Sequence, residues 1–322
     1  MPLINLYPRL TSFASLHAAA RRAQLGKRYL PAVLAFNANL EAELLRLQEE
    51  LRSFTYRPGP YRQFRIRDPK PRVISAAPYR DRVVHHALCA AIVPSLQRQF
   101  HPGSHANRVG FGSHRALRRF TAAAARHRWV LQADIRLYFP SIDLTILRAQ
   151  LAAVIACPGT LWLLDQILAN GATIGPALDA FPGDTLLTPL ERPQGLPIGN
   201  LTSQFLANLH LNAIDHTLSA LPGVRAYLRY VDDLALFADH PEPLHRARQL
   251  RGLCGAAGQA AGAQSQLAQG APAVASAAPG GGRRSSTPGG GPFQPAELEC
   301  SPGPWPHLAA AAASVCRPCL WI

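Results

Sequence analysis

The sequence predicts a mixed α/β (α+β) fold in residues 1–251 and no packed fold in residues 252–322. In some segments apolar residues recur at helical spacing and in others they alternate, and these two periods distinguish helices from strands. Acidic residues stand where two of the expected strands end. The composition then changes abruptly near residue 251.

The first expected unit is an N-terminal helical extension, residues 1–53. Within it, residues 34–51 are typical of an amphipathic helix, because four leucines recur at helical spacing. They are Leu40, Leu44, Leu47 and Leu51.

A β-hairpin is expected next, over residues 63–75. Phe64 and Ile66 alternate with polar residues before the hairpin tip. The tip, Asp68-Pro69-Lys70-Pro71, is a typical turn sequence, and the apolar pair Val73-Ile74 follows it.

Two longer helices and three further strands are expected downstream. Residues 79–100 carry an apolar stripe at helical spacing, and residues 201–218 form the second helix. Residues 129–134 read as a short strand that ends in a carboxylate. Residues 226–237 read as a second hairpin, with Asp232-Asp233 at its turn.

The C-terminal segment, residues 252–322, has a different composition. Of its 71 residues, 38 are Ala, Gly or Pro. Such a segment has few large apolar side chains to offset the entropy cost of ordering the chain. We therefore expect a disordered tail.

The charge of the chain favours a polyanionic partner. The formal net charge is +14, and most of the basic excess lies before residue 252. A GC-rich genome would explain why nearly all basic residues are arginines, but not their excess over acids. No apolar run is long enough to cross a bilayer, no secretion signal is visible, and the six cysteines lack dense spacing. These features indicate a reduced cytoplasmic protein, with no membrane partner.

Three carboxylates are the candidate catalytic residues: Asp134, Asp232 and Asp233. Two-metal phosphoryl transfer needs acidic oxygens that hold two Mg²⁺ ions about 3.5–4 Å apart. Adjacent aspartates are also common in ordinary turns, so the pair alone leaves both interpretations open. Apolar residues flank the pair on both sides, and burying acids in such surroundings is costly unless a cation compensates.

Two segments resemble the reverse transcriptase family. Tyr230-Val231-Asp232-Asp233 is similar to the third palm motif of that family, and residues 134–143 are similar to the first. The resemblance implies a right-hand polymerase fold and a metal site formed by Asp134, the Ile135 carbonyl, Asp232 and Asp233. It also implies that Phe139 is the bulky steric gate that excludes a nucleotide 2′-hydroxyl, although Phe139 could also be an ordinary core residue.

Residues 194–204 resemble the intervening motif of the same family. A loop that is rich in Gly and Pro and runs into a helix lets the backbone approach a base pair and a triphosphate closely. Gln194 and Gly195 are therefore expected to contact substrate. Most of these enzymes have Ser-Pro where this chain has Ser203-Gln204. The form found here resembles the enzymes of diversity-generating retroelements and of some related bacterial lineages. In the former, it goes with error-prone copying of adenines.

Residues 70–74 and 79–88 resemble the fingers motifs of reverse transcriptases. Arg72 is the first candidate to pair with a triphosphate, because charge-assisted hydrogen bonds suit phosphate oxygens. Lys70 is expected at the template backbone or in solvent. Residues 107–117 match a further family segment whose chemistry is not evident from the sequence. His85-His86 is expected to be structural or to face the template.

The resemblance implies an RNA-directed DNA polymerase with fingers and palm over residues 54–251. Its partners would be an RNA template, a DNA or RNA primer and dNTPs, and an accessory protein is left open. No thumb is recognisable after Arg251. A truncated, inactive nucleic-acid-binding remnant and an antiphage-defence reverse transcriptase are therefore alternatives. Residues 262–269 can be encoded so that translation from one base later gives a sequence similar to the next family element, and a frameshift is therefore a hypothesis that the gene's nucleotide sequence would test.

Overall fold

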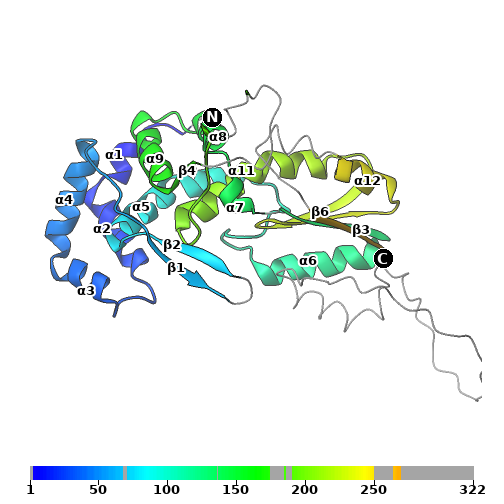
Figure 1. Cartoon of the computed structure of the whole chain (residues 1–322), viewed down its shortest axis with the longest axis horizontal. Coiled ribbons are helices and arrows are strands. Elements are labelled where there is room, and N and C mark those ends of the chain that lie inside the picture. Colours follow the sequence, from blue (N-terminus) through cyan, green and yellow to red (C-terminus); the bar gives the residue numbers. More distant parts are fainter. Residues whose placement is uncertain are drawn as a thin grey trace, which may run out of the picture.

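The structure, a computed structural model, describes residues 3–67, 71–135, 137–174, 185, 191–249 and 264–269. The described chain is elongated (Figure 1). Helices of the N-terminal part gather at one end, and a four-stranded sheet occupies the other end. A two-stranded hairpin lies between these two parts.

Four helices form the N-terminal part: α1 (Leu6–Leu10), α2 (Phe13–Ala23), α3 (Pro31–Ala38) and α4 (Leu40–Arg52). The prediction of one helix over residues 34–51 is wrong, because the helix is interrupted at Asn39, between α3 and α4. Asn39 has φ −125° and ψ 39°, which lies outside the helical region. Leu44, Leu47 and Leu51 are fully buried and Leu40 is partly buried against the same core, so the predicted apolar stripe of α4 is confirmed.

Helix α5 (Tyr79–Leu96) is the central helix of the N-terminal core. It ends earlier than predicted, because a 3₁₀ turn, Gln97–Gln99, takes over before Phe100. The predicted stripe is confirmed, since all of its members are buried: Val83, Val84, Ala87, Leu88 and Ile92. His85 is buried as well, and burial lowers its pKa to about 4, which fits a structural role.

The predicted fingers-like hairpin is confirmed. Strands β1 (Arg62–Ile66) and β2 (Arg72–Ala76) pair antiparallel, with Phe64 opposite Ile74. Most of their residues are exposed, so the hairpin is attached to the core mainly through the end of β2. The tip that contains Lys70 lies outside the described residues.

The large sheet has the strand order β6-β7-β3-β8, and its neighbouring strands are antiparallel. Its members are β3 (Trp129–Asp134), β6 (Val224–Tyr230), β7 (Asp233–Ala238) and β8 (Gln264–Gln269). The strand and hairpin predicted at 129–134 and 226–237 are thus confirmed. The prediction of no regular structure after residue 251 is wrong for residues 264–269, because the open edge of β3 offers them a full set of backbone partners.

Two helices cover opposite faces of this sheet (Figure 1). Helix α11 (Leu201–Ser219) shares the main core with Tyr227, Leu234 and Leu236. Helix α6 (Ser113–Arg126) packs on the other face, where Phe237 is fully buried. The alternation of side chains along β6 and β7 therefore supplies both cores.

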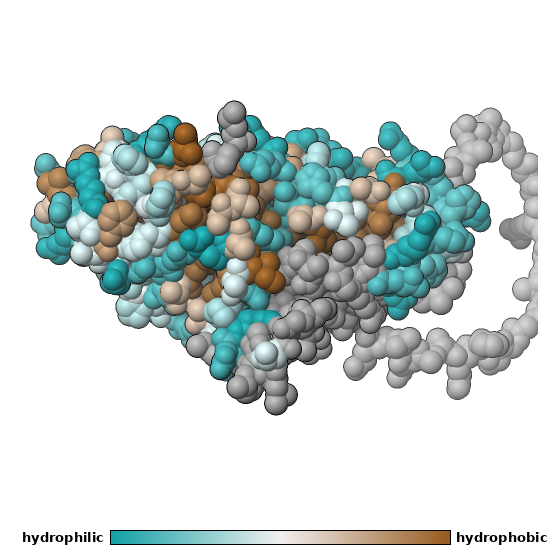
Figure 2. All heavy atoms as spheres, turned by 90° about the horizontal axis from the view of Figure 1, so that it is seen from above, coloured by the Kyte–Doolittle hydropathy of each residue, from teal (hydrophilic) through white to brown (hydrophobic). Residues whose placement is uncertain are grey.

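The remaining elements join these parts. They are α7 (Tyr138–Ser141), α8 (Leu144–Val154), α9 (Pro158–Gly171), β4 (Thr173–Ile174), β5 (Pro193–Gln194) and α12 (Glu242–Gln249). On the face shown in Figure 2, apolar residues gather mainly over the middle of the molecule, between more hydrophilic ends. In the part of the chain that the structure describes, no helix combines the length and apolarity needed to traverse a bilayer.

Candidate active site

The three predicted carboxylates lie at one end of the large sheet. Asp134 is the last residue of β3 and is paired in register with Asp233, the first residue of β7. Residues directly opposite in an antiparallel pair have Cα atoms about 4.5–5.5 Å apart. Asp232 lies in the hairpin turn immediately before Asp233, and its carbonyl accepts a hydrogen bond from the Ile135 amide at 3.2 Å. Asp134 and Asp233, 99 positions apart in the sequence, thus meet at one end of the sheet.

The hairpin turn between β6 and β7 is strained. Val231 has φ +60°, in the left-handed region that a β-branched residue rarely adopts. A residue held there costs on the order of 1–3 kcal/mol and persists only when its surroundings fix it. This strain directly precedes the acidic pair.

The carboxylates do not form a closed metal cage. Among the described residues, no group of three or more His, Cys, Asp or Glu side chains converges into a site that could hold a metal ion by itself. Mg²⁺ is commonly bound through one or two carboxylates together with substrate phosphates and waters. An open, half-buried set of aspartate oxygens suits that ion.

The predicted substrate loop contacts the first acidic segment. The Leu196 amide donates to the Phe139 carbonyl at 2.8 Å, and the Gly195 amide donates to the Ile142 carbonyl at 2.9 Å. Gly195 has φ +95°, so a side chain at this position would be strained. Gln194 precedes it in β5, and the structure therefore brings Gln194, Gly195 and Phe139 together.

The same loop also holds the fingers hairpin. The Asn200 side chain donates to the Ser75 carbonyl at 2.9 Å and accepts from the Ala77 amide at 3.3 Å. The Ser75 amide in turn donates to the Ile198 carbonyl at 2.8 Å. Arg72 is exposed at the start of this strand, so the loop anchors the hairpin that carries the candidate triphosphate-binding arginine.

Asp143, the last residue of the first acidic segment, has a structural role. Its carboxylate accepts hydrogen bonds from the Thr145 and Ile146 amides at 2.7 and 3.0 Å, and so caps helix α8. It also pairs with Arg192 at 3.1 Å, and both side chains are buried. The sequence did not reveal this ion pair, which joins the segment to β5.

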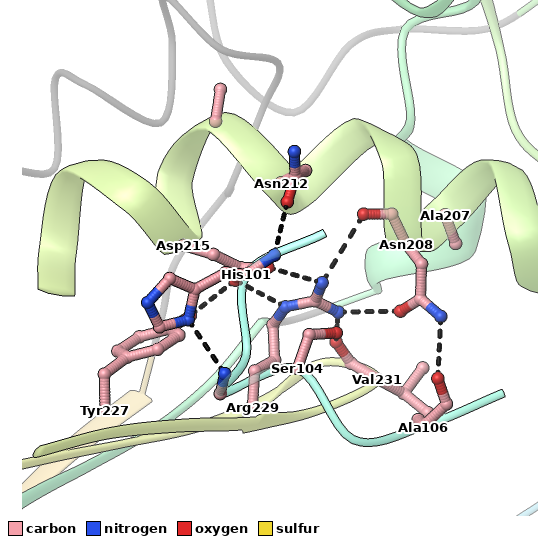
Figure 3. Close-up of polar contacts among 12 residues, drawn as sticks. His101, Ser104, Ala106, Ala207, Asn208, Asn212, Asp215, Tyr227, Arg229 and Val231 are labelled. Carbon is pink, nitrogen blue, oxygen red and sulfur yellow. Dashed lines mark hydrogen bonds and ion pairs between the residues drawn. The ribbon is translucent and has the colours of Figure 1, made fainter. Parts of the chain in front are cut away.

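Sequence reasoning also missed the buried ion pair of Arg229 and Asp215, which lies behind the hairpin turn (Figure 3). Burial alone lowers the pKa of Arg229, but the charge and hydrogen bonds of Asp215 raise it above its usual value. The only signal in the sequence is an arginine inside an apolar strand. Arginine is rarely buried unless it is paired.

Of residues 107–117, whose chemistry was not evident, residues 107–112 lie in a structural loop and residues 113–117 begin helix α6. The Arg108 guanidinium donates to the His101 and Ser104 carbonyls at 2.8 Å and stacks 4.0 Å from the centre of the Phe111 ring. The loop so formed adds to the edge of β6. The Arg229 amide donates to the Gly103 carbonyl at 2.8 Å, and the His105 amide donates to the Arg229 carbonyl at 2.9 Å.

Helix α6 presents a strongly basic surface on the other face of the sheet. Five arginines on or just after it are exposed: Arg115, Arg118, Arg119, Arg126 and Arg128. The chain has no Asp or Glu between residues 82 and 133. Two open hollows of about 630 and 560 Å³ lie along this helix, and both are lined by Arg119.

These features match a known family. The sequence model described as reverse transcriptase (RNA-dependent DNA polymerase) matches residues 66–253, more than half of the chain. The chain belongs to the reverse transcriptase family. The mixed helix and strand fold agrees with the fingers and palm of that family, and the matched residues include β2, α5, β3, β6 and β7.

Protein YkfC of Escherichia coli (strain K12) is a similar protein. It is 29% identical to this chain over 189 residues, which cover 56% of this chain and 46% of YkfC. The matched region thus spans about half of the relative's length. The likeness is therefore to part of YkfC.

We expect Asn200→Ala to lower the free energy of unfolding by about 1–3 kcal/mol, because it leaves buried backbone groups of the hairpin without partners. Chemical denaturation monitored by circular dichroism measures this. Thr217→Ala, at an exposed position of α11, is the control and should change stability by less than about 0.5 kcal/mol. Equal effects of the two substitutions would contradict the bridging role of Asn200.

Proposed function

We propose that this chain is an RNA-directed DNA polymerase. The reaction is attack of a primer 3′-hydroxyl on the α-phosphate of a dNTP, directed by an RNA template. The observation that carries the proposal is the pairing of Asp134 with Asp233 at the end of two adjacent strands, with Asp232 in the turn between β6 and β7. Membership of the reverse transcriptase family supports the same reaction.

Three aspartates and one backbone group would hold Mg²⁺: Asp134, Asp232, Asp233 and the Ile135 carbonyl. When bound, Mg²⁺ supplies positive charge for the attacking and leaving oxygens. The residues of the chain do the positioning. Gln194 and Gly195 lie against the segment of Phe139, where a nucleotide base and sugar would be oriented, and Arg72 would pair with the triphosphate.

The arginines of α6 support a nucleic-acid partner. They lie along one helix without any acidic residue in the surrounding sequence, and phosphate groups would neutralise them. Sequence-independent contacts of this kind position a backbone without selecting bases. An RNA template and a DNA or RNA primer are the partners that we propose, in a cytoplasmic setting.

The decisive experiment is primer extension on an RNA template with Asp232→Asn. We expect incorporation to fall by about 100-fold or more, because one ligand charge for the metal is lost. The Kd for template–primer should change by less than about 3-fold, since the basic surfaces are untouched. Asp239→Asn, just beyond the opposite end of β7, is the matched control and should extend primers normally.

Extension by Asp232→Asn at the wild-type rate would overturn the metal assignment. A wild-type chain that binds RNA but extends no primer would instead identify the inactive remnant. An accessory protein, if it is needed, would restore extension when cell extract from the native host is added.

Phe139 would select the sugar of the incoming nucleotide. Phe139→Ala removes the bulk that would meet a 2′-hydroxyl, so we expect the preference for dNTPs over rNTPs, in kcat/KM, to fall by at least about 10-fold. Single-nucleotide incorporation with each substrate measures this ratio. Phe205→Ala, in the buried face of α11, is the control for loss of an aromatic side chain and should leave the ratio unchanged. An unchanged ratio in Phe139→Ala would assign Phe139 to the core alone.

The motif at residues 198–204, which runs from the loop into helix α11, supports a role in a diversity-generating retroelement. Gln204 is exposed on the first turn of α11, just after the loop that contacts the fingers. We expect cDNA made by the chain to carry more misincorporations opposite template adenines than opposite other bases. Deep sequencing of products from a mixed-sequence template measures this. Equal misincorporation rates opposite all four template bases would contradict the role in a diversity-generating retroelement. An antiphage role would then be favoured.

A further inference from the structure

Arg229 is the largest side chain that is fully buried in the described part of the chain. Taking a guanidinium and a carboxylate out of water costs several kcal/mol per ion, and apolar residues of similar volume often serve stability as well or better. Overall stability is therefore a weak reason for an arginine at this position. Its contacts point to a more specific role.

All five N–H groups of Arg229 are used (Figure 3). Nε and Nη2 bind the two carboxylate oxygens of Asp215, at 2.6 and 2.8 Å. Nη2 also donates to the Asn208 carbonyl at 3.4 Å. Nη1 donates to the Asn208 side chain at 2.9 Å and to the Val231 carbonyl at 2.8 Å.

The contact with Val231 reaches the hairpin turn. Val231 holds its left-handed conformation immediately before Asp232. Its carbonyl is fixed by Arg229, and the next carbonyl, that of Asp232, is fixed by the Ile135 amide. Two consecutive carbonyl groups of the turn are therefore fixed, one from β6 and one from the residue that follows β3, and this fixes the backbone that carries Asp232 and Asp233.

The other end of the network is anchored in helix α11. Asp215 is fully buried and also accepts the Tyr227 hydroxyl at 2.6 Å. Asn208, two helical turns earlier, donates to the Ala106 carbonyl at 2.8 Å. Helix α11 begins at the loop that contacts Phe139 and the fingers, so one rigid element connects that loop to the turn.

We propose that Arg229 is a positioning residue for the catalytic turn, which it fixes through the Val231 carbonyl and ties to helix α11 through Asp215 and Asn208. The inference rests on the proposed polymerase function. Arg229 has no contact with substrate in this role. It acts by keeping the strained turn in one conformation, so that the carboxylates need no reorganisation when substrate binds.

The test removes both buried charges together. Arg229→Met with Asp215→Asn leaves an amide that still accepts the Tyr227 hydroxyl, and loss of a complete buried pair is often neutral for stability. We expect the melting temperature to stay within about 4 °C of wild type. The kcat for dNTP addition should fall by about 100-fold, whereas KM for dNTP and the Kd for template–primer should change by less than about 3-fold.

A matched control is the ion pair of Arg148 and Asp165, which joins α8 to α9 and is partly exposed. Arg148→Met with Asp165→Asn removes the same two charges elsewhere and should leave kcat unchanged. If this control loses kcat to the same extent as the Arg229 variant, the effect is a general consequence of charge removal and the positioning role is wrong.

If the double variant does not fold, Arg229→Lys tests the positioning role instead. A lysine ammonium can pair with Asp215. It cannot reproduce the planar guanidinium, which binds the Asp215 carboxylate through Nε and Nη2 and the Val231 carbonyl through Nη1. We expect kcat to fall by at least about 10-fold with an unchanged KM. If a variant of Arg229 that folds keeps the wild-type kcat while Asp232→Asn is inactive, the positioning role is wrong and the proposed polymerase function stands. A wild-type chain without extension would overturn the proposed function and this inference with it.

Discussion

The antiparallel pairing of β3 with β7 is the constraint on which the rest of the site depends. Its register places Asp134 opposite Asp233, and a shift by one residue would move every side chain of the strand to the other face. Both faces are buried, one under α11 and the other under α6, so such a shift would expose two apolar cores at once. The packing of the sheet therefore enforces the meeting of the carboxylates.

Buried charge then determines how the turn and the loop are held. Each polar network occupies a place where backbone must take an irregular path: Arg229 with Asp215 behind the hairpin turn, and Arg192 with Asp143 beside the substrate loop. Ion pairs of this kind contribute little net stability, but the pair of Arg229 tolerates few alternative geometries because all five N–H groups of Arg229 are used. These two pairs therefore favour one backbone conformation at the turn and at the loop.

Much of this could be predicted from the sequence, because the signals are local. Apolar periodicity located α4, α5 and α11, and the turn chemistry located both hairpins. The break at Asn39, the ion pairs and strand β8 could not be predicted, because each depends on partners distant in the chain. Arg229 and Asp215 acquire their roles only when β6 packs on α11. The metal and substrate roles of the predicted residues remain proposals.

Strand β8 closes one side of the palm sheet, and the loop at Gly103–His105 closes the other. A chain that ended at residue 251 would leave the outer edge of β3 as an open row of backbone donors and acceptors. Exposed edges of this kind recruit strands from other molecules. Strand β8 thus covers an edge of the sheet through which two copies of the protein could otherwise associate.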